Sequence, residues 1–93
     1  MEANAMKTAQ SGTLESMDCL VVVTGSDAGR IIEISGGAVV RFKASMEKHI
    51  NDTLDALGAG EHLRVLVQDN GALDVVLGAR VEAAYKRYAR LAI

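Results

Sequence analysis

Proline, aromatic residues and cysteine are scarce in this sequence. Its 93 residues include no proline and no tryptophan, and only one phenylalanine, two tyrosines and one cysteine. Without proline, no rigid linker divides the chain, and with so few rings the core must consist of aliphatic and methionine side chains. The lone Cys19 cannot form an internal disulfide. This pattern is typical of a reducing compartment, and we expect a cytoplasmic protein.

Strong charge and long apolar runs are also missing. The formal net charge is -2 and no run of basic residues occurs, which argues against a nucleic-acid partner. No stretch of about 18 or more apolar residues is present, so we expect no membrane span and no membrane partner. Residues 1–10 lack the apolar segment of a secretory signal.

What is present fits one small domain. A chain of this length is expected to be compact, with a radius of gyration of about 12 to 13 Å. Residues 1–12 carry few large apolar side chains, and we expect them to form a flexible N-terminal arm. Residues 13–93 are then the single domain.

Three short segments have strand character. Residues 19–23 form a run rich in valine, and after the turn-rich segment 24–29, residues 30–35 provide a second strand. The length of the connection predicts an antiparallel hairpin. Residues 62–69 alternate between apolar and polar side chains and are expected to form a third strand.

Two longer segments have helical periodicity. The first has an apolar stripe at steps of three and four residues: Val39, Phe42, Met46, Ile50, Leu54 and Leu57. Gly58 and Gly60 would end it. In the alternative, residues 38–43 form a further strand, but the unbroken stripe favours the longer helix. A second stripe covers residues 73–91, with Asn70 as a plausible N-cap.

The predicted order is therefore strand, strand, helix, strand, helix. One face of a small, mainly antiparallel sheet would pack on the two helices. The fold class expected from the sequence is α+β, as a two-layer sandwich.

Residues that commonly carry chemistry are few and scattered. His49 and His62 lie on different predicted elements, and no pair of cysteines or histidines has the spacing of a zinc site. Cys19 has no histidine close to it in sequence and is interpreted as a packed strand residue. The glycine-rich segments lack the ending of a phosphate-binding loop. The sequence predicts no metal site and no catalytic residue.

Arg80 and Arg87 would project from one flank of the second helix, because they are seven residues apart. Such a basic strip suits the phosphates of a nucleotide or an acidic partner surface. The simpler alternative, solvated charges that keep the helix soluble, is favoured by the sequence alone.

A short polar segment precedes the first predicted strand. Within it, Ser16 lies between Glu15 and Asp18, with no histidine or lysine nearby in sequence to act as a base. Taken alone, the segment is typical of a solvated turn.

The chain nevertheless resembles the acyl carrier (gamma) subunits of citrate lyase. The resemblance rests on Gly-Thr-Leu-Glu-Ser-x-Asp at residues 12–18, on Asp-Asn-Gly-Ala-Leu-Asp at residues 69–74 and on the Arg/Ala/Glu-rich segment 79–83. It covers nearly the whole chain. Met17 departs from the family, which often has a small residue at this position.

The resemblance implies that Ser16 carries a covalent prosthetic group, 2'-(5''-phosphoribosyl)-3'-dephospho-CoA, joined through a phosphodiester. Acetyl and citryl thioesters on this group would take part in the cleavage of citrate to oxaloacetate and acetate. The alpha subunit (acyl transferase) and the beta subunit (acyl lyase) would perform the catalysis, and a dedicated transferase would attach the group. The chain would thus be a non-catalytic carrier subunit.

Two alternatives stay open. The carrier subunits of citramalate lyase and malonate decarboxylase use the same kind of prosthetic group, and the sequence does not separate them from citrate lyase. A small interaction or regulatory domain without a covalent group is the second alternative. An ordinary phosphopantetheine carrier is disfavoured, because it would be a helical bundle with Asp-Ser-Leu at a helix start, whereas Ser16 precedes a predicted strand.

Overall fold

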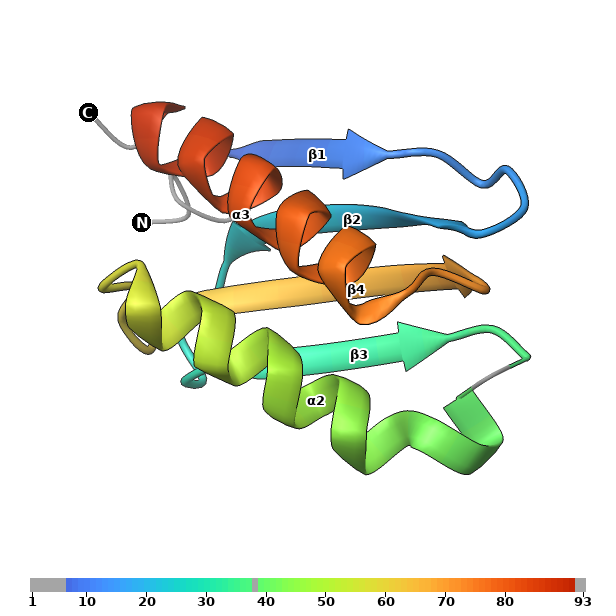
Figure 1. Cartoon of the computed structure of the whole chain (residues 1–93). Helices are drawn as coiled ribbons and strands as arrows, with labels where there is room; N and C mark the ends of the chain where they lie inside the picture. Colours follow the sequence, from blue (N-terminus) through green and yellow to red (C-terminus); the bar gives the residue numbers. More distant parts are fainter. Residues whose placement is uncertain (1–6, 38, 92–93) are drawn as a thin grey trace.

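Four strands and two helices make up the part of the chain that the computed structural model describes, residues 7–37 and 39–91. The strands are β1 (Thr8–Gly12), β2 (Asp18–Gly25), β3 (Ile31–Ser35) and β4 (Leu63–Asn70), and the helices are α2 (Val39–Ala56) and α3 (Asp74–Leu91). The strands form one sheet in the order β1-β2-β4-β3, and both helices cover the same face of it (Figure 1). The predicted α+β two-layer class is confirmed.

Residues 8–12 form the N-terminal strand β1. The prediction of a flexible arm over residues 1–12 is therefore wrong for residues 8–12. These residues pair antiparallel with β2. The side chains of Ala9 and Ser11 are buried where β1 contacts α3. Because both are small, α3 can lie close to this edge of the sheet, and a segment without large apolar residues still packs. The part of the predicted arm at residues 1–6 lies outside the described residues.

The predicted hairpin between residues 19–23 and 30–35 is wrong, because β2 and β3 are not neighbours. Strand β4 lies between them, antiparallel to β2 and parallel to β3. A parallel pair needs a crossover connection, and α2 provides it between β3 and β4. Two of the three strand pairs are antiparallel, so the mainly antiparallel sheet is confirmed.

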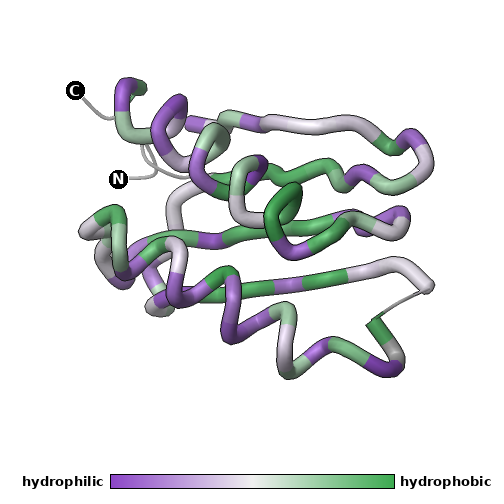
Figure 2. Tube along the Cα trace, viewed as in Figure 1, coloured by the Kyte–Doolittle hydropathy of each residue, from purple (hydrophilic) through white to green (hydrophobic). Residues whose placement is uncertain are grey.

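The hydrophobic core lies between the sheet and the helices. Figure 2 shows hydrophobic residues along the central strands β2 and β4 and a mixture of hydrophobic and hydrophilic residues along both helices. Alternate side chains of β2 and β4 and the inner faces of both helices fill the core; its fully buried members include Val21, Val23, Val65, Val67, Ile50, Leu54, Leu77 and Val81. Helix α2 begins at Val39, so the longer helix is confirmed and the strand alternative for residues 39–43 is wrong. Residue 38 lies outside the described residues. Neither helix of the described part is long and apolar enough to cross a membrane.

The two helices approach each other closely at Gly78. A Cβ atom on Gly78 would lie 2.9 Å from the Nε2 atom of His49. The same nitrogen is 2.8 Å from the backbone oxygen of Asp74, in the first turn of α3. His49 therefore links α2 to α3.

Candidate functional site

Ser16 lies in the turn that joins β1 to β2, which we call the Ser16 turn (residues 13–17), at one end of the molecule (Figure 1). Every residue of the turn is exposed to solvent. Within residues 7–37 and 39–91, no group forms a hydrogen bond with the Ser16 hydroxyl. The hydroxyl is therefore accessible from outside the protein, and it sits between two paired strands rather than after a free arm.

Local hydrogen bonds give the Ser16 turn a defined backbone. The amide of Thr13 donates to the carbonyl oxygen of Cys19 at 3.2 Å, and the amide of Asp18 donates to that of Glu15 at 3.1 Å. The hydroxyl of Thr13 accepts from the amide of Glu15 at 3.1 Å. Met17 adopts a left-handed conformation with φ of 65°, which is uncommon for a residue with a side chain. This conformation reverses the chain directly after Ser16.

Asp18 is the centre of the polar network beneath the turn. Its carboxylate accepts hydrogen bonds from the Thr13 hydroxyl at 2.7 Å, from the Cys19 amide at 2.7 Å, and from Nε and Nη2 of Arg80 at 3.0 and 2.8 Å. The two bonds from Arg80, followed by those from Thr13 and Cys19, hold the pKa of Asp18 well below its usual value of 3.8. Asp18 thus stays ionised and ties α3 to the base of the turn.

Asn70 joins the turn to the segment that leads into α3. Its Nδ2 atom donates to the backbone oxygen of Leu14 at 2.9 Å, and its own backbone oxygen accepts from the amide of Met17 at 2.7 Å. Asn70 ends β4 and does not cap α3, so the predicted N-cap is wrong. The buried carboxylate of Asp69 instead accepts from the amides of Gly71 and Ala72, at 3.1 and 3.0 Å.

Gly12 opens the turn and leaves no room for a side chain. Its φ is +98°, and a Cβ atom there would lie 1.9 Å from the backbone oxygen of Cys19. Only glycine adopts this conformation without a clash or a change in the backbone. Glycine is therefore required at residue 12, where the chain leaves β1 and enters the Ser16 turn.

Among the described residues, no proton acceptor forms a hydrogen bond with the Ser16 hydroxyl. The acidic neighbours are Glu15, which is exposed, and Asp18, whose oxygens are occupied by donors and whose pKa is lowered. A serine nucleophile in catalysis needs a nearby proton acceptor and usually oxyanion donors. An exposed hydroxyl on a protruding, well-anchored turn fits instead a covalent group that another protein attaches.

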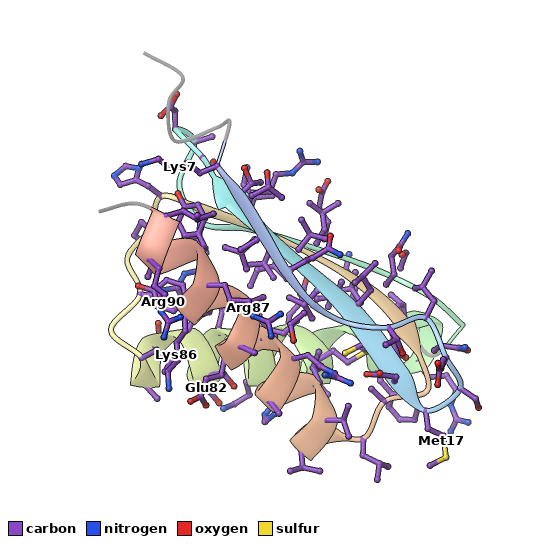
Figure 3. The ribbon with its side chains drawn as sticks, turned by 90° about the horizontal axis from the view of Figure 1, so that it is seen from above. Lys7, Met17, Glu82, Lys86, Arg87 and Arg90 are labelled. Carbon is purple, nitrogen blue, oxygen red and sulfur yellow. The ribbon has the colours of Figure 1, made fainter. Side chains whose placement is uncertain are left out.

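The other predicted site residues lie in different places. Arg80 contacts Asp18 at the base of the turn, whereas Nη1 of Arg87 donates to the backbone oxygen of Gln10 in β1 at 2.6 Å. Both arginines fasten α3 to the β1–β2 pair, and Figure 3 shows Arg87 on the same helix as Lys86 and Arg90. Their contact with phosphates or with a partner stays a prediction.

Cys19 is fully buried on the helix-covered face of β2, as predicted. Burial, followed by the negative charges of Asp18 and Asp69, raises the pKa of its thiol to about 11. A thiol in this state is a poor nucleophile. Cys19 is therefore a core residue whose backbone bonds to Thr13 and Asp18 but whose thiol takes no part in the site.

Sequence reasoning missed the residues that hold the turn: Thr13, Asp18, Asn70 and the role of Arg80. Asp18 and Arg80 are 62 residues apart, so no local spacing connects them. The only signal was the joint presence of the segments 12–18 and 69–74, which the structure brings together through Asn70.

Comparisons with known proteins support one family. The family model described as malonate decarboxylase delta subunit matches residues 6–88. The citrate lyase acyl carrier protein of Pectobacterium atrosepticum is 38% identical over 82 residues, which cover 88% of this chain and 84% of that protein. The citrate lyase acyl carrier protein of Rhodopseudomonas palustris has the same identity and coverage. Citrate lyase acyl carrier protein 2 of Salmonella typhimurium is 39% identical over 85 residues, or 90% of this chain and 87% of that protein.

Proposed function

This chain belongs to the acyl carrier family that includes the citrate lyase acyl carrier proteins and the malonate decarboxylase delta subunits, and from that membership we propose that it is the acyl carrier subunit of a citrate lyase. It is a carrier and not a catalytic subunit. The observation that carries this proposal is an accessible serine hydroxyl on an anchored turn, with no hydrogen bond to a proton acceptor among the described residues.

Ser16 is the attachment point of the prosthetic group in this proposal. The group is 2'-(5''-phosphoribosyl)-3'-dephospho-CoA, and when bound it supplies a thiol whose acetyl and citryl thioesters permit the cleavage of citrate to oxaloacetate and acetate. The hydroxyl of Ser16 is used once, as the acceptor when a transferase attaches the group. Its exposure and the absence of hydrogen bonds to it within the described residues support this role.

The residues around Ser16 hold the point of attachment of the prosthetic group in place. Arg80 and Asn70 connect the turn to α3 and to the end of β4, so the point of attachment keeps its position on the folded domain. A tether of this kind keeps an acyl group at high effective concentration near two active sites. The partners are the alpha (acyl transferase) and beta (acyl lyase) subunits and the prosthetic-group transferase, in the cytoplasm.

The replacement Ser16→Ala tests the proposal. The variant is expected to fold normally, because the hydroxyl makes no hydrogen bond in the described part of the chain, but to gain no mass when it is produced together with the modifying enzymes. The assembled complex should lose citrate cleavage. Intact mass spectrometry and peptide mapping of the Ser16 segment provide the measurement. Ser45→Ala, on the exposed start of α2, is the matched control and should be modified fully. Full activity of the Ser16→Ala complex would overturn the assignment.

A carrier for malonate decarboxylase is the second candidate, because the matching family model bears that description. A carrier for citramalate lyase is chemically equivalent. The carrier itself discriminates little between acyl groups. The substrate profile of the assembled complex therefore separates these possibilities. If no covalent adduct forms on Ser16 in a competent source, the remaining alternative is an unmodified interaction or regulatory domain.

A further inference from the structure

Four exposed apolar side chains gather at the end of the molecule that carries Ser16. They are Leu14, Met17, Leu73 and Val75, which are 57%, 61%, 59% and 74% exposed. Two belong to the Ser16 turn; Leu73 directly precedes α3, and Val75 lies in its first turn. Exposed apolar side chains that cluster in this way mark interaction sites, whereas single ones do not.

The Ser16 turn and the segment before α3 lie next to each other. Asn70 bonds to Leu14 and Met17 as described above, and the next residue, Gly71, faces Met17, with its Cβ position 3.8 Å from the Met17 Cα atom. Leu73 follows two residues later. Figure 1 shows the turn and the start of α3 at the same end of the molecule, and Figure 3 places Met17 far from Lys7 and Arg90 at the other end.

Two acidic residues, Glu15 and Asp74, belong to these segments. Glu15 and Asp74 are exposed, and neither carboxylate forms an ion pair with any residue that the structure describes. Asp18 is neutralised by Arg80. A protein that binds the phosphates of a nucleotide needs basic residues in its own site. An apolar surface bordered by free carboxylates is complementary to such a protein.

We propose that this surface, formed by Leu14, Met17, Leu73 and Val75 and bordered by Glu15 and Asp74, is the docking site of the enzyme that attaches the prosthetic group. The inference rests on the proposed role of Ser16. Attachment forms a bond between Ser16 Oγ and phosphorus, breaks a phosphoanhydride bond of an activated nucleotide donor, releases its polyphosphate and passes the hydroxyl proton to a base of the enzyme.

The site of reaction favours this occupant over the lyase subunits. The transferase acts on the Ser16 oxygen itself, so its active site must cover the turn and with it Leu14 and Met17. The lyase subunits act at the distal end of the attached group and reach it without covering the turn. Leu73 and Val75 would extend the contact beyond the Ser16 turn. Both are more than 50 residues away from Ser16 in the sequence. Their replacement therefore tests docking without changing the residues next to Ser16.

The test compares Leu73→Ser/Val75→Ser with Leu91→Ser as substrates of the purified transferase and its nucleotide donor. Leu91 is 47% exposed at the opposite end of α3 and serves as the matched control. Time courses of the mass increase give kcat and KM for modification of Ser16. The double variant is expected to lose about tenfold or more in kcat/KM, mainly through KM, because both replacements remove apolar surface that docking would bury. The control should stay within about twofold of wild type.

The amide region of the far-UV circular dichroism spectrum verifies that each variant is folded. If the double variant is unfolded, Val75→Ser alone replaces it. Wild-type kinetics in the folded variants would overturn the docking proposal while leaving Ser16 as the attachment point. Failure of the wild-type chain to become modified would instead contradict the proposed function. Weakened binding to the lyase subunits, with unchanged modification, would assign the surface to those subunits and also overturn the proposal.

Discussion

At the scale of single residues, the shape of the site depends on Asp18. Its carboxylate receives donors from the turn, from β2 and from α3, so one side chain connects three parts of the fold. The sequence singled out Ser16, whose hydroxyl forms no hydrogen bond in the part of the chain that the structure describes. The proposed attachment residue and the residue that anchors its turn are thus different. The role of Asp18 is evident only once the fold places Arg80 beside it.

The lowered pKa of Asp18 predicts how stability depends on pH. Because the folded state depresses this pKa, Asp18 stabilises the fold above its unfolded pKa, and the contribution is lost as pH falls from about 4 towards the folded value. Asp18→Asn should therefore be less stable than wild type at pH 7, and the difference should shrink on acidification. Urea unfolding between pH 7 and about pH 2 measures it.

Asp52→Asn is the matched control for this experiment. Asp52 pairs with Lys48 on the exposed face of α2, where ion pairs contribute little. A difference between Asp18→Asn and wild type that stays constant over the whole pH range would contradict the prediction.

At the scale of elements, periodicity predicted the helices better than the sheet. The apolar stripes of α2 and α3 are local patterns, and both helices occur where those patterns lie. Strand β1 was missed because its buried residues, Ala9 and Ser11, are too small to produce an alternating pattern. The β2–β3 hairpin was wrong because loop length alone does not exclude another strand from the space between two strands.

The junction of β1 and β2 gives a prediction at this scale. Gly12→Ala should destabilise the protein by at least about 2 kcal/mol, because the new methyl group would overlap the backbone oxygen of Cys19 in a left-handed conformation. Gly60→Ala is the control, since Gly60 has ordinary φ and no atom within 4 Å of its Cβ position. Chemical denaturation of both variants provides the comparison. Equal stability of the two would show that the turn relaxes without cost.

At the scale of the whole molecule, the sheet and both helices enclose one core. The Cα radius of gyration is 12.3 Å, within the range expected from the chain length. Cys19 lies in this core with no exposed surface, beneath α3. Its reactivity therefore reports on opening of the fold rather than on the local environment of the turn.

We expect Cys19 in the folded protein to react with a thiol reagent only when the core opens. Burial and a pKa raised to about 11 both disfavour the thiolate in the native state. The rate of labelling at pH 8 should rise with urea concentration in parallel with global unfolding. A denatured sample provides the maximal rate. Rapid labelling of the native protein would show that β2 and α3 separate locally.

The sequence by itself determined the fold class and the extents of both helices, because both follow from patterns of residues close together in the chain. It singled out the candidate serine through a resemblance that rests on three separate segments, residues 12–18, 69–74 and 79–83. Only the tertiary structure decided the order of the strands, the pairing of β1 and the network of Asp18, Arg80 and Asn70. These features depend on contacts between residues as many as 62 positions apart, whose geometry is fixed when the sheet and the helices pack.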